Sequence, residues 1–329
     1  MKPSLFFLST LVLWASCTVP DPKRLRQPQG VPSLAELDGW LDDREQKVPG
    51  LKPGVEAGVV WAGFDKAQTP VSIVYFPGYT ATRGEISPAV DRIAQALGAN
   101  LFFSRPTGQG VGFEGHHNVT MNDWVNDGLE ALEIGRKLGR KVVLVATSTG
   151  GTLATWLTLG PAAARVAAII LVSPNLTPAN SKTEMLLWPG KEMWLSWFVG
   201  GTVTFEARNE LQARYLDLTH HSHSLIPMMQ LVQLARKSDF SRWPTPSLVV
   251  YDPEDTVVNE AVTVKLFSQA PPWLVTLHSW TAAPGDDHHV LAGDALSPGG
   301  TDNFVALAVR YLTGVINGEE NRITKQFLR

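Results

Sequence analysis

The stretch VVLVATSTGG, residues 142–151, sets a serine directly behind an apolar, β-branched run and ahead of several small residues. The run predicts a buried strand, and the residues behind Ser148 predict a helix that begins at once. A tight junction of this kind can hold a serine hydroxyl out above a sheet as a nucleophile. The strand and helix backbones approach closely there, which requires small residues two positions before and after the serine, here Ala146 and Gly150. A plain strand-to-helix turn would give the same short pattern, so other residues must decide.

Strand-like and helix-like segments alternate outward from this junction. Strands are predicted at 58–61, 71–76, 99–103, 166–172, 247–251 and 274–277, and helices at 124–138 and 148–159. Ser33 and Glu36 have the spacing of a capping box and predict a helix start. The alternation predicts an α/β fold with a mostly parallel, doubly wound sheet. It stops between residues 178 and 245, where we expect a cap inserted over the strand ends, between core segments 33–177 and 246–329.

Candidate partners for the serine follow two later strands. DPEDTVV (252–258) comes directly after one strand, and DDHHVL (286–291) follows the next. Carboxyl ends of parallel strands share one edge of a sheet, so these loops can converge on Ser148. An acyl-transfer serine needs a histidine base and an acid that orients it, and on this architecture the chain order is serine, acid, histidine. The order and the placement together are a stronger signal than any single motif.

Over residues 55–312 the chain resembles an α/β-hydrolase of the carboxylesterase and monoacylglycerol-lipase branch. The resemblance implies that Ser148 is the nucleophile, Asp255 the acid and His289 the base. Asp252 begins the same turn and is expected to fix the loop. His288 lies one residue out of register and is expected to be a solvated loop histidine.

The resemblance also implies an oxyanion hole. Residues 76–79, FPGY, are similar to the family's oxyanion loop, with Pro77 at the position of its histidine. The backbone amides of Tyr79 and Thr149 are therefore the expected donors. The simpler interpretation of the same residues is a Pro-Gly turn.

The implied function is hydrolysis of carboxylic esters through an acyl-enzyme intermediate, without a metal or organic cofactor. The same triad could serve a thioesterase or an amidase, and a non-catalytic envelope lipoprotein on a hydrolase scaffold is the alternative from another class. Aromatic side chains of the cap either bind an apolar acyl group or form the cap's own core; the candidates are Trp188, Trp194 and Trp197.

Histidines are grouped in the cap, at His220, His221 and His223. Their spacing matches no zinc-binding motif, so a solvated polar turn is expected. The net charge of −3 with mixed signs argues against a nucleic-acid partner. The oligomeric state is left open.

The N-terminus has the features of a bacterial lipoprotein signal. Residues 1–16 combine a lysine with a short apolar run, too short to span a bilayer, and predict a signal peptide. Cys17, the sole cysteine, follows LWAS in a stretch that resembles a lipobox. Lipidation of Cys17, with residues 17–32 as a flexible tether, would anchor the domain in the envelope. Thr18 stands where an aspartate would resemble an inner-membrane retention signal, so the outer membrane is expected. Ordinary cleavage that leaves no lipid is the alternative.

Overall fold

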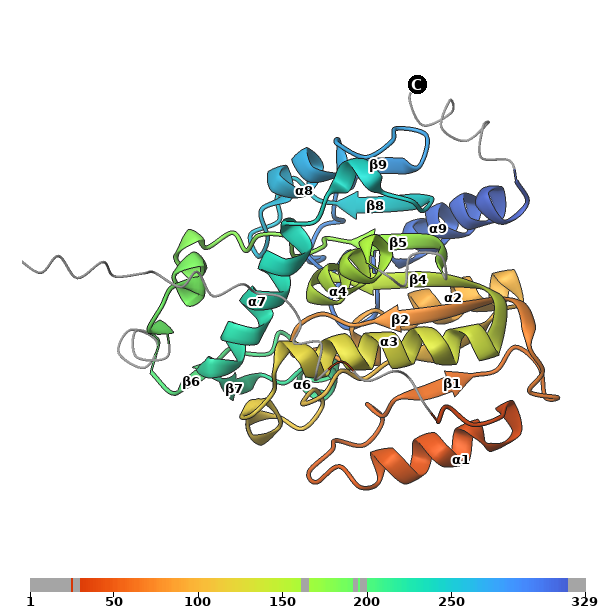
Figure 1. Cartoon of the computed structure of the whole chain (residues 1–329), viewed down its shortest axis with the longest axis horizontal. Coiled ribbons are helices and arrows are strands. Elements are labelled where there is room, and N and C mark those ends of the chain that lie inside the picture. The colour runs from red at the N-terminus through yellow and green to blue at the C-terminus, as the bar shows by residue number, and fades with distance from the viewer. Residues whose placement is uncertain (1–24, 26–29, 161–165, 192–194, 196–199, 319–329) are drawn as a thin grey trace, which may run out of the picture.

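A computed structural model describes residues 25, 30–160, 166–191, 195 and 200–318, which form a central sheet with helices on both faces (Figure 1). Within these ranges seven strands pair in the order β1–β3–β2–β4–β5–β8–β9. β1 is antiparallel to β3, and the other neighbours are parallel. The strands are β1 (Gly58–Val60), β2 (Thr69–Phe76), β3 (Asn100–Phe103), β4 (Gly139–Thr147), β5 (Val166–Val172), β8 (Ser247–Tyr251) and β9 (Val275–Ser279). The predicted α/β fold with a mostly parallel sheet is confirmed.

The strand order reverses between β2 and β4. From β2 the chain moves outward to β3, and from β4 it moves the opposite way to β5. Loops at such a switch point diverge, which opens a crevice outside the carboxyl ends of the strands. The loop after β2 and the residues after β4 contain Tyr79 and Ser148, so both candidate regions lie at this point.

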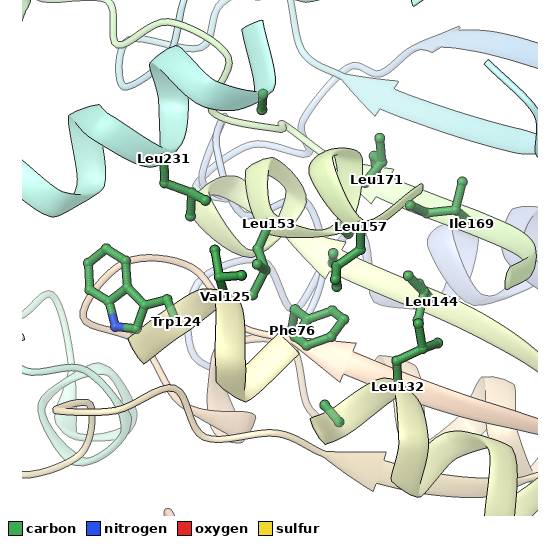
Figure 2. Packing of buried hydrophobic residues seen from close by; sticks show 14 of the residues in the cluster. Phe76, Trp124, Val125, Leu132, Leu144, Leu153, Leu157, Ile169, Leu171 and Leu231 are labelled. Atoms are coloured by element: carbon green, nitrogen blue, oxygen red, sulfur yellow. The ribbon is translucent and has the colours of Figure 1, made fainter. Parts of the chain in front are cut away.

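Two apolar layers cover the sheet because the side chains of each strand alternate between its faces. In β2, Val74 and Phe76 belong to one buried cluster, and Ile73 and Tyr75 belong to the other. The first cluster contains residues of helices α1, α3, α4 and α7, and Figure 2 shows its packing around Phe76. The second cluster contains residues of helices α2 and α9. The helices are α1 (Leu34–Glu45), α2 (Ala89–Leu97), α3 (Met121–Leu138), α4 (Ser148–Leu159), α7 (Leu225–Arg236), α8 (Glu260–Phe267) and α9 (Thr301–Ile316).

The caps of α3 and α1 differ. Thr120 and Asp123 form a complete capping box at the start of α3, in which each side chain bonds the other residue's backbone amide. The predicted box at Ser33 is wrong in detail, because the Ser33 hydroxyl donates to the Glu36 carboxylate at 2.7 Å and caps no backbone amide. The helix itself still begins at Leu34, as expected.

The segment between β5 and β8 breaks the βα alternation and carries short elements beside α7 (Figure 1). They are η4 (Ser181–Leu187), β6 (Thr202–Thr204), α6 (Glu210–Tyr215), β7 (Thr219–His221), η5 (Ser222–Ser224) and η6 (Phe240–Arg242). We call residues 178–245 the cap. It contacts the loop after β2 through main-chain bonds, since the Asp217 amide donates to the Thr80 carbonyl at 2.7 Å and Ala81 pairs with Leu216.

Several sequence predictions lie outside the described residues: the signal segment 1–16, the lipidation site Cys17, most of the tether 17–32, and Trp194 and Trp197. No helix within the described ranges is both long and apolar enough to cross a bilayer.

Candidate active site

Ser148 occupies the sharp turn between β4 and α4. Its φ of 51° lies in the left-handed region, which costs energy for a residue with a side chain. The turn is tight because α4 lies against the loop after β2. A Cβ added at Gly150 would lie 2.3 Å from the Phe76 carbonyl oxygen and 2.4 Å from that of Pro77. Ser148 is 7% exposed at the N-terminus of α4, where unpaired amides and the helix dipole favour negative charge.

Asp255 and His289 form a hydrogen-bonded pair beyond the ends of β8 and β9. The His289 Nδ1–H donates to Asp255 Oδ2 at 2.7 Å, and both side chains are buried. The second carboxylate oxygen, Oδ1, accepts from the amides of Val257 at 2.7 Å and Val258 at 3.1 Å. Three donors thus hold the carboxylate. The bond at Nδ1 leaves Nε2 of His289 as the ring nitrogen able to take a proton.

Carboxylates around His289 control its protonation. Burial by itself would lower the pKa of His289, but the bond to Asp255 and the charges of Asp255, Asp287 and Glu85 raise it above the ordinary histidine value. Asp287 Oδ1 also accepts from the amides of His289 at 2.7 Å and Val290 at 2.8 Å. The loop is therefore fixed on both sides of the imidazole.

The loop after β2 is held so that the Tyr79 amide has a defined direction. The Gly78 amide donates to Glu85 Oε2 at 2.8 Å, and the Gly78 carbonyl accepts from Gln109 Nε2 at 3.1 Å. Because a peptide unit is planar, fixing the Gly78 carbonyl also fixes the Tyr79 N–H that shares its plane. The Thr149 amide belongs to the first turn of α4, where amides have no partner within the helix.

The cap holds the other end of Tyr79. The Tyr79 hydroxyl bonds His220 Nδ1 at 3.0 Å and also bonds the hydroxyl of Ser224. His220 is 1% exposed, so the expected solvated turn is wrong at this position. Burial lowers the pKa of His220, which favours the neutral ring.

Asp217 ties the cap to the loop after β3. Its carboxylate accepts from the amides of Gly110 at 2.7 Å and Gly112 at 2.9 Å, from His116 Nε2 at 3.0 Å and from Lys52 at 3.0 Å. Hydrogen bonds and charges from His116 and Lys52 outweigh burial and lower the pKa of Asp217. This network fixes the cap to the loop after β3.

Asp252 and His288 form a second pair next to the first. Asp252 binds its own loop, accepting from the amides of Glu254 at 2.9 Å and Ala282 at 3.1 Å. The His288 Nδ1 lies 2.9 Å from Asp252 Oδ2. His288 is partly exposed, as expected of a loop histidine, but it is anchored rather than merely solvated.

Sequence reasoning missed the residues that support the site. Glu85 and Gln109 carry no motif of their own and become visible only in the folded structure. Asp287 lies within the quoted DDHHVL stretch, and its local bonds to the amides of His289 and Val290 were not anticipated. Of the predicted aromatic contacts, Trp188 is 58% exposed at the end of η4. Across the described ranges, no group of three His, Cys, Asp or Glu side chains could hold a metal ion.

Comparisons with known proteins place the chain in a family. The model of the alpha/beta hydrolase family matches residues 73–310. Among curated proteins none matches the chain. A solved structure from work on LipS and LipT, two metagenome-derived lipolytic enzymes, is similar, with a TM-score of 0.64 and 15% identity over 81% of this chain and 99% of the other.

Two lipase structures are also similar to the chain. The monoacylglycerol lipase of Paleococcus ferrophilus has a TM-score of 0.58 and 14% identity over 79% of this chain and 99% of its own. A soluble variant of the monoglyceride lipase of Saccharomyces cerevisiae, bound to a substrate analogue, has a TM-score of 0.59 and 12% identity over 82% and 97%. At such low identity, the similarity to these structures establishes a shared fold and no more. The family model, in contrast, matches most of the sequence. The chain belongs to the alpha/beta hydrolase family.

Proposed function

We propose that this protein is a serine hydrolase that cleaves carboxylic esters, with Ser148 as nucleophile, His289 as base and Asp255 as its orienting acid. One observation carries the proposal. A histidine and an aspartate, bonded at 2.7 Å and buried, belong to the same strand-end edge as a serine with a left-handed backbone. Backbone strain of this kind clusters at functional sites, and the same turn places Ser148 at the N-terminus of α4.

The reaction proceeds in two steps. His289 Nε2 takes the Ser148 proton as Oγ attacks the acyl carbon, and the tetrahedral intermediate then expels the alcohol, which takes the proton from the imidazolium. In the second step His289 activates water, which attacks the acyl-enzyme and releases the carboxylic acid. Asp255 holds the productive tautomer and stabilises the imidazolium throughout.

The amides of Tyr79 and Thr149 are the proposed oxyanion donors. Backbone donors that are already oriented need no reorganisation when charge develops, which is why they contribute strongly to catalysis. The bonds that hold Gly78 on both sides, and the position of Thr149 in the first turn of α4, support this assignment.

An ester with an apolar acyl group is the proposed substrate. Support comes from the similar lipolytic structures and from the aromatic residues of the cap, Trp188, Trp194 and Trp197. The N-terminal sequence supports a lipid anchor on Cys17 in a bacterial envelope, which would hold the domain beside membrane lipids.

The test is hydrolysis of p-nitrophenyl esters of increasing acyl length by a protein that begins at Thr18. We expect turnover by the wild type, and a loss on the order of 10⁶ in kcat for Ser148→Ala. Thr152→Ser, on the buried face of the same helix, is the matched control and should stay active. A folded wild-type protein that cleaves none of these esters and does not react with a fluorophosphonate would refute the proposal.

A further inference from the structure

Glu85 is a buried carboxyl group to which the proposed reaction gives no role. It ends η1 (Arg83–Glu85) and is 3% exposed. Its Oε2 accepts hydrogen bonds from the Gly78 amide at 2.8 Å and from the Tyr75 hydroxyl at 2.8 Å. A carboxyl group is costly to bury unless it is hydrogen-bonded, so a site that retains one here has a use for it or for its bonds.

The carboxyl group of Glu85 packs against the backbone of Gly78, which in turn packs against Ser148. A Cβ added at Gly78 would lie 2.6 Å from Glu85 Oε1 and 3.3 Å from the Cβ of Ser148. Glu85 and Ser148 therefore flank the same glycine. Any larger residue at this position would displace the carboxylate, the serine or the loop.

Through Tyr75, Glu85 is also connected to the turn that carries the second proposed oxyanion donor, the Thr149 amide. The Tyr75 hydroxyl that bonds Glu85 lies 3.0 Å from Oγ1 of Thr147, the residue before the nucleophile. One carboxylate thus connects the loop that presents the Tyr79 amide with the turn that presents the Thr149 amide. A displacement of about 1 Å in such a site can cost on the order of 10²-fold in rate, so a connection between its two halves matters.

The charge of Glu85 acts on the proposed base. Burial raises the pKa of Glu85, while its bonds to Gly78 and Tyr75 and the charge of His289 oppose that rise. In return, Glu85 is one of the carboxylates that raise the pKa of His289, after Asp255 and Asp287. An ionised Glu85 would stabilise the imidazolium that forms when Ser148 loses its proton.

We propose that Glu85 is a positioning residue of the hydrolase site, which fixes the Gly78–Tyr79 peptide and the nucleophile turn and supports the imidazolium of His289 by its charge. The inference rests on the proposed function for its catalytic consequence. Its structural content, the restraint on Gly78 and the field at His289, can be measured without any substrate.

Two substitutions separate the hydrogen bonds from the charge. The side-chain carbonyl of Glu85→Gln can still accept from Gly78 and Tyr75, but the charge is gone. Glu85→Ala removes both. Asp302→Asn is the control, because it removes one carboxylate from an exposed position on α9.

With a short p-nitrophenyl ester, we expect Glu85→Ala to lower kcat about 10- to 100-fold with little change in KM, since transition-state alignment is lost while ground-state contacts remain. Glu85→Gln should retain most of kcat at alkaline pH. Its acid limb of kcat/KM should move to lower pH, because His289 loses one of the charges that raise its pKa. Asp302→Asn should match the wild type in both respects.

Two measurements on the resting protein complete the test. The ring of His289, followed by NMR against pH, should titrate at lower pH in Glu85→Gln than in the wild type. Exchange of the Gly78 amide should be faster in Glu85→Ala and largely preserved in Glu85→Gln. An unchanged His289 titration with an unchanged kcat in Glu85→Ala would overturn the proposal. If Glu85→Ala fails to fold, the pH profile and the ring titration of Glu85→Gln decide.

The failure of the two proposals would look different. A wild type without ester turnover or fluorophosphonate labelling refutes the serine hydrolase, yet the ring titration and the Gly78 exchange still report on Glu85. An active wild type whose Glu85 variants match it refutes the role of Glu85 alone.

Discussion

Two neighbouring histidines bond two aspartates of one turn, yet their surroundings differ. His289 bonds Asp255 at 2.7 Å with 11% of its side chain exposed, whereas His288 bonds Asp252 at 2.9 Å with 43% of its side chain exposed. The residue types and the bonds are nearly the same. Burial, and the neighbours that each ring faces, make the difference.

The direction of the pKa shift does not distinguish the two histidines. The bond to Asp252 raises the pKa of His288, and carboxylates raise that of His289 despite its burial. The second nitrogen of His288 faces Glu254, an exposed carboxylate 3.8 Å away. His289 instead lies within the field of Glu85, which packs beside Ser148. A perturbed histidine is therefore a candidate base only where a nucleophile adjoins it.

Exchanging His289 for alanine gives the largest expected effect, and the same change at His288 is its matched control. His289→Ala should lower kcat by about 10⁴- to 10⁶-fold, because the serine loses its base. His288→Ala should remain within a few-fold of the wild type, since solvent screens its exposed ring. Steady-state hydrolysis of one ester by both variants makes the measurement.

The pH profile adds a second check on the same pair. The base must be neutral to take the serine proton, so kcat/KM should rise as pH increases through the pKa of His289, above the ordinary histidine range. Since His288→Ala leaves that base in place, it should keep this limb. If His288→Ala is the inactive variant instead, the assignment of the two pairs is reversed.

The two aspartates should separate catalysis from stability. Asp255→Asn should cost on the order of 10⁴ in kcat, because an amide favours the wrong tautomer of His289. Asp252→Asn should retain activity but lose about 1–3 kcal/mol of stability. Its two oxygens serve the amides of Glu254 and Ala282 separately, and an asparagine has one carbonyl for both. Urea unfolding beside ester hydrolysis compares them, and equal losses of kcat would contradict the division.

Sequence reasoning reached the parts of this molecule that are encoded locally. The run before Ser148 is an uninterrupted buried strand, and β5 and β8 follow the predicted bounds at Val166–Val172 and Ser247–Tyr251. Short-range periodicity and turn chemistry determine these elements. The fold class followed from their alternation.

Contacts between segments far apart in the sequence could not be predicted in this way. His220 meets Tyr79 across 141 residues of the chain, and Asp217 meets Gly110 across 107. No spacing rule connects such residues, because their encounter depends on how the cap packs on the core. The histidines of the cap consequently resembled a polar surface turn, although His220 is buried and bonds the Tyr79 hydroxyl.

An exposed ion pair between Arg208 of the cap and Asp287 beside the base gives the smallest expected effect. Asp287 precedes both histidines; its Oδ1 holds the amides of His289 and Val290, and its Oδ2 pairs with Arg208 of the cap at 2.7 Å. Arg208 is 59% exposed at its side chain, and exposed ion pairs contribute at most about 1 kcal/mol. Arg208→Ala should therefore change kcat/KM no more than about five-fold, and the change should shrink at high salt.

Asp287→Ala should cost more than Arg208→Ala, and its cost should persist in salt, because it releases two amides beside the base rather than one surface contact. Kinetics of both variants at low and high ionic strength make the comparison. Equal, salt-sensitive losses would mean that the ion pair to the cap, and not the pair of amide bonds, orients the His289 loop. In that case the cap would govern the base directly, and the contrast between His288 and His289 would depend on the cap as much as on the aspartates.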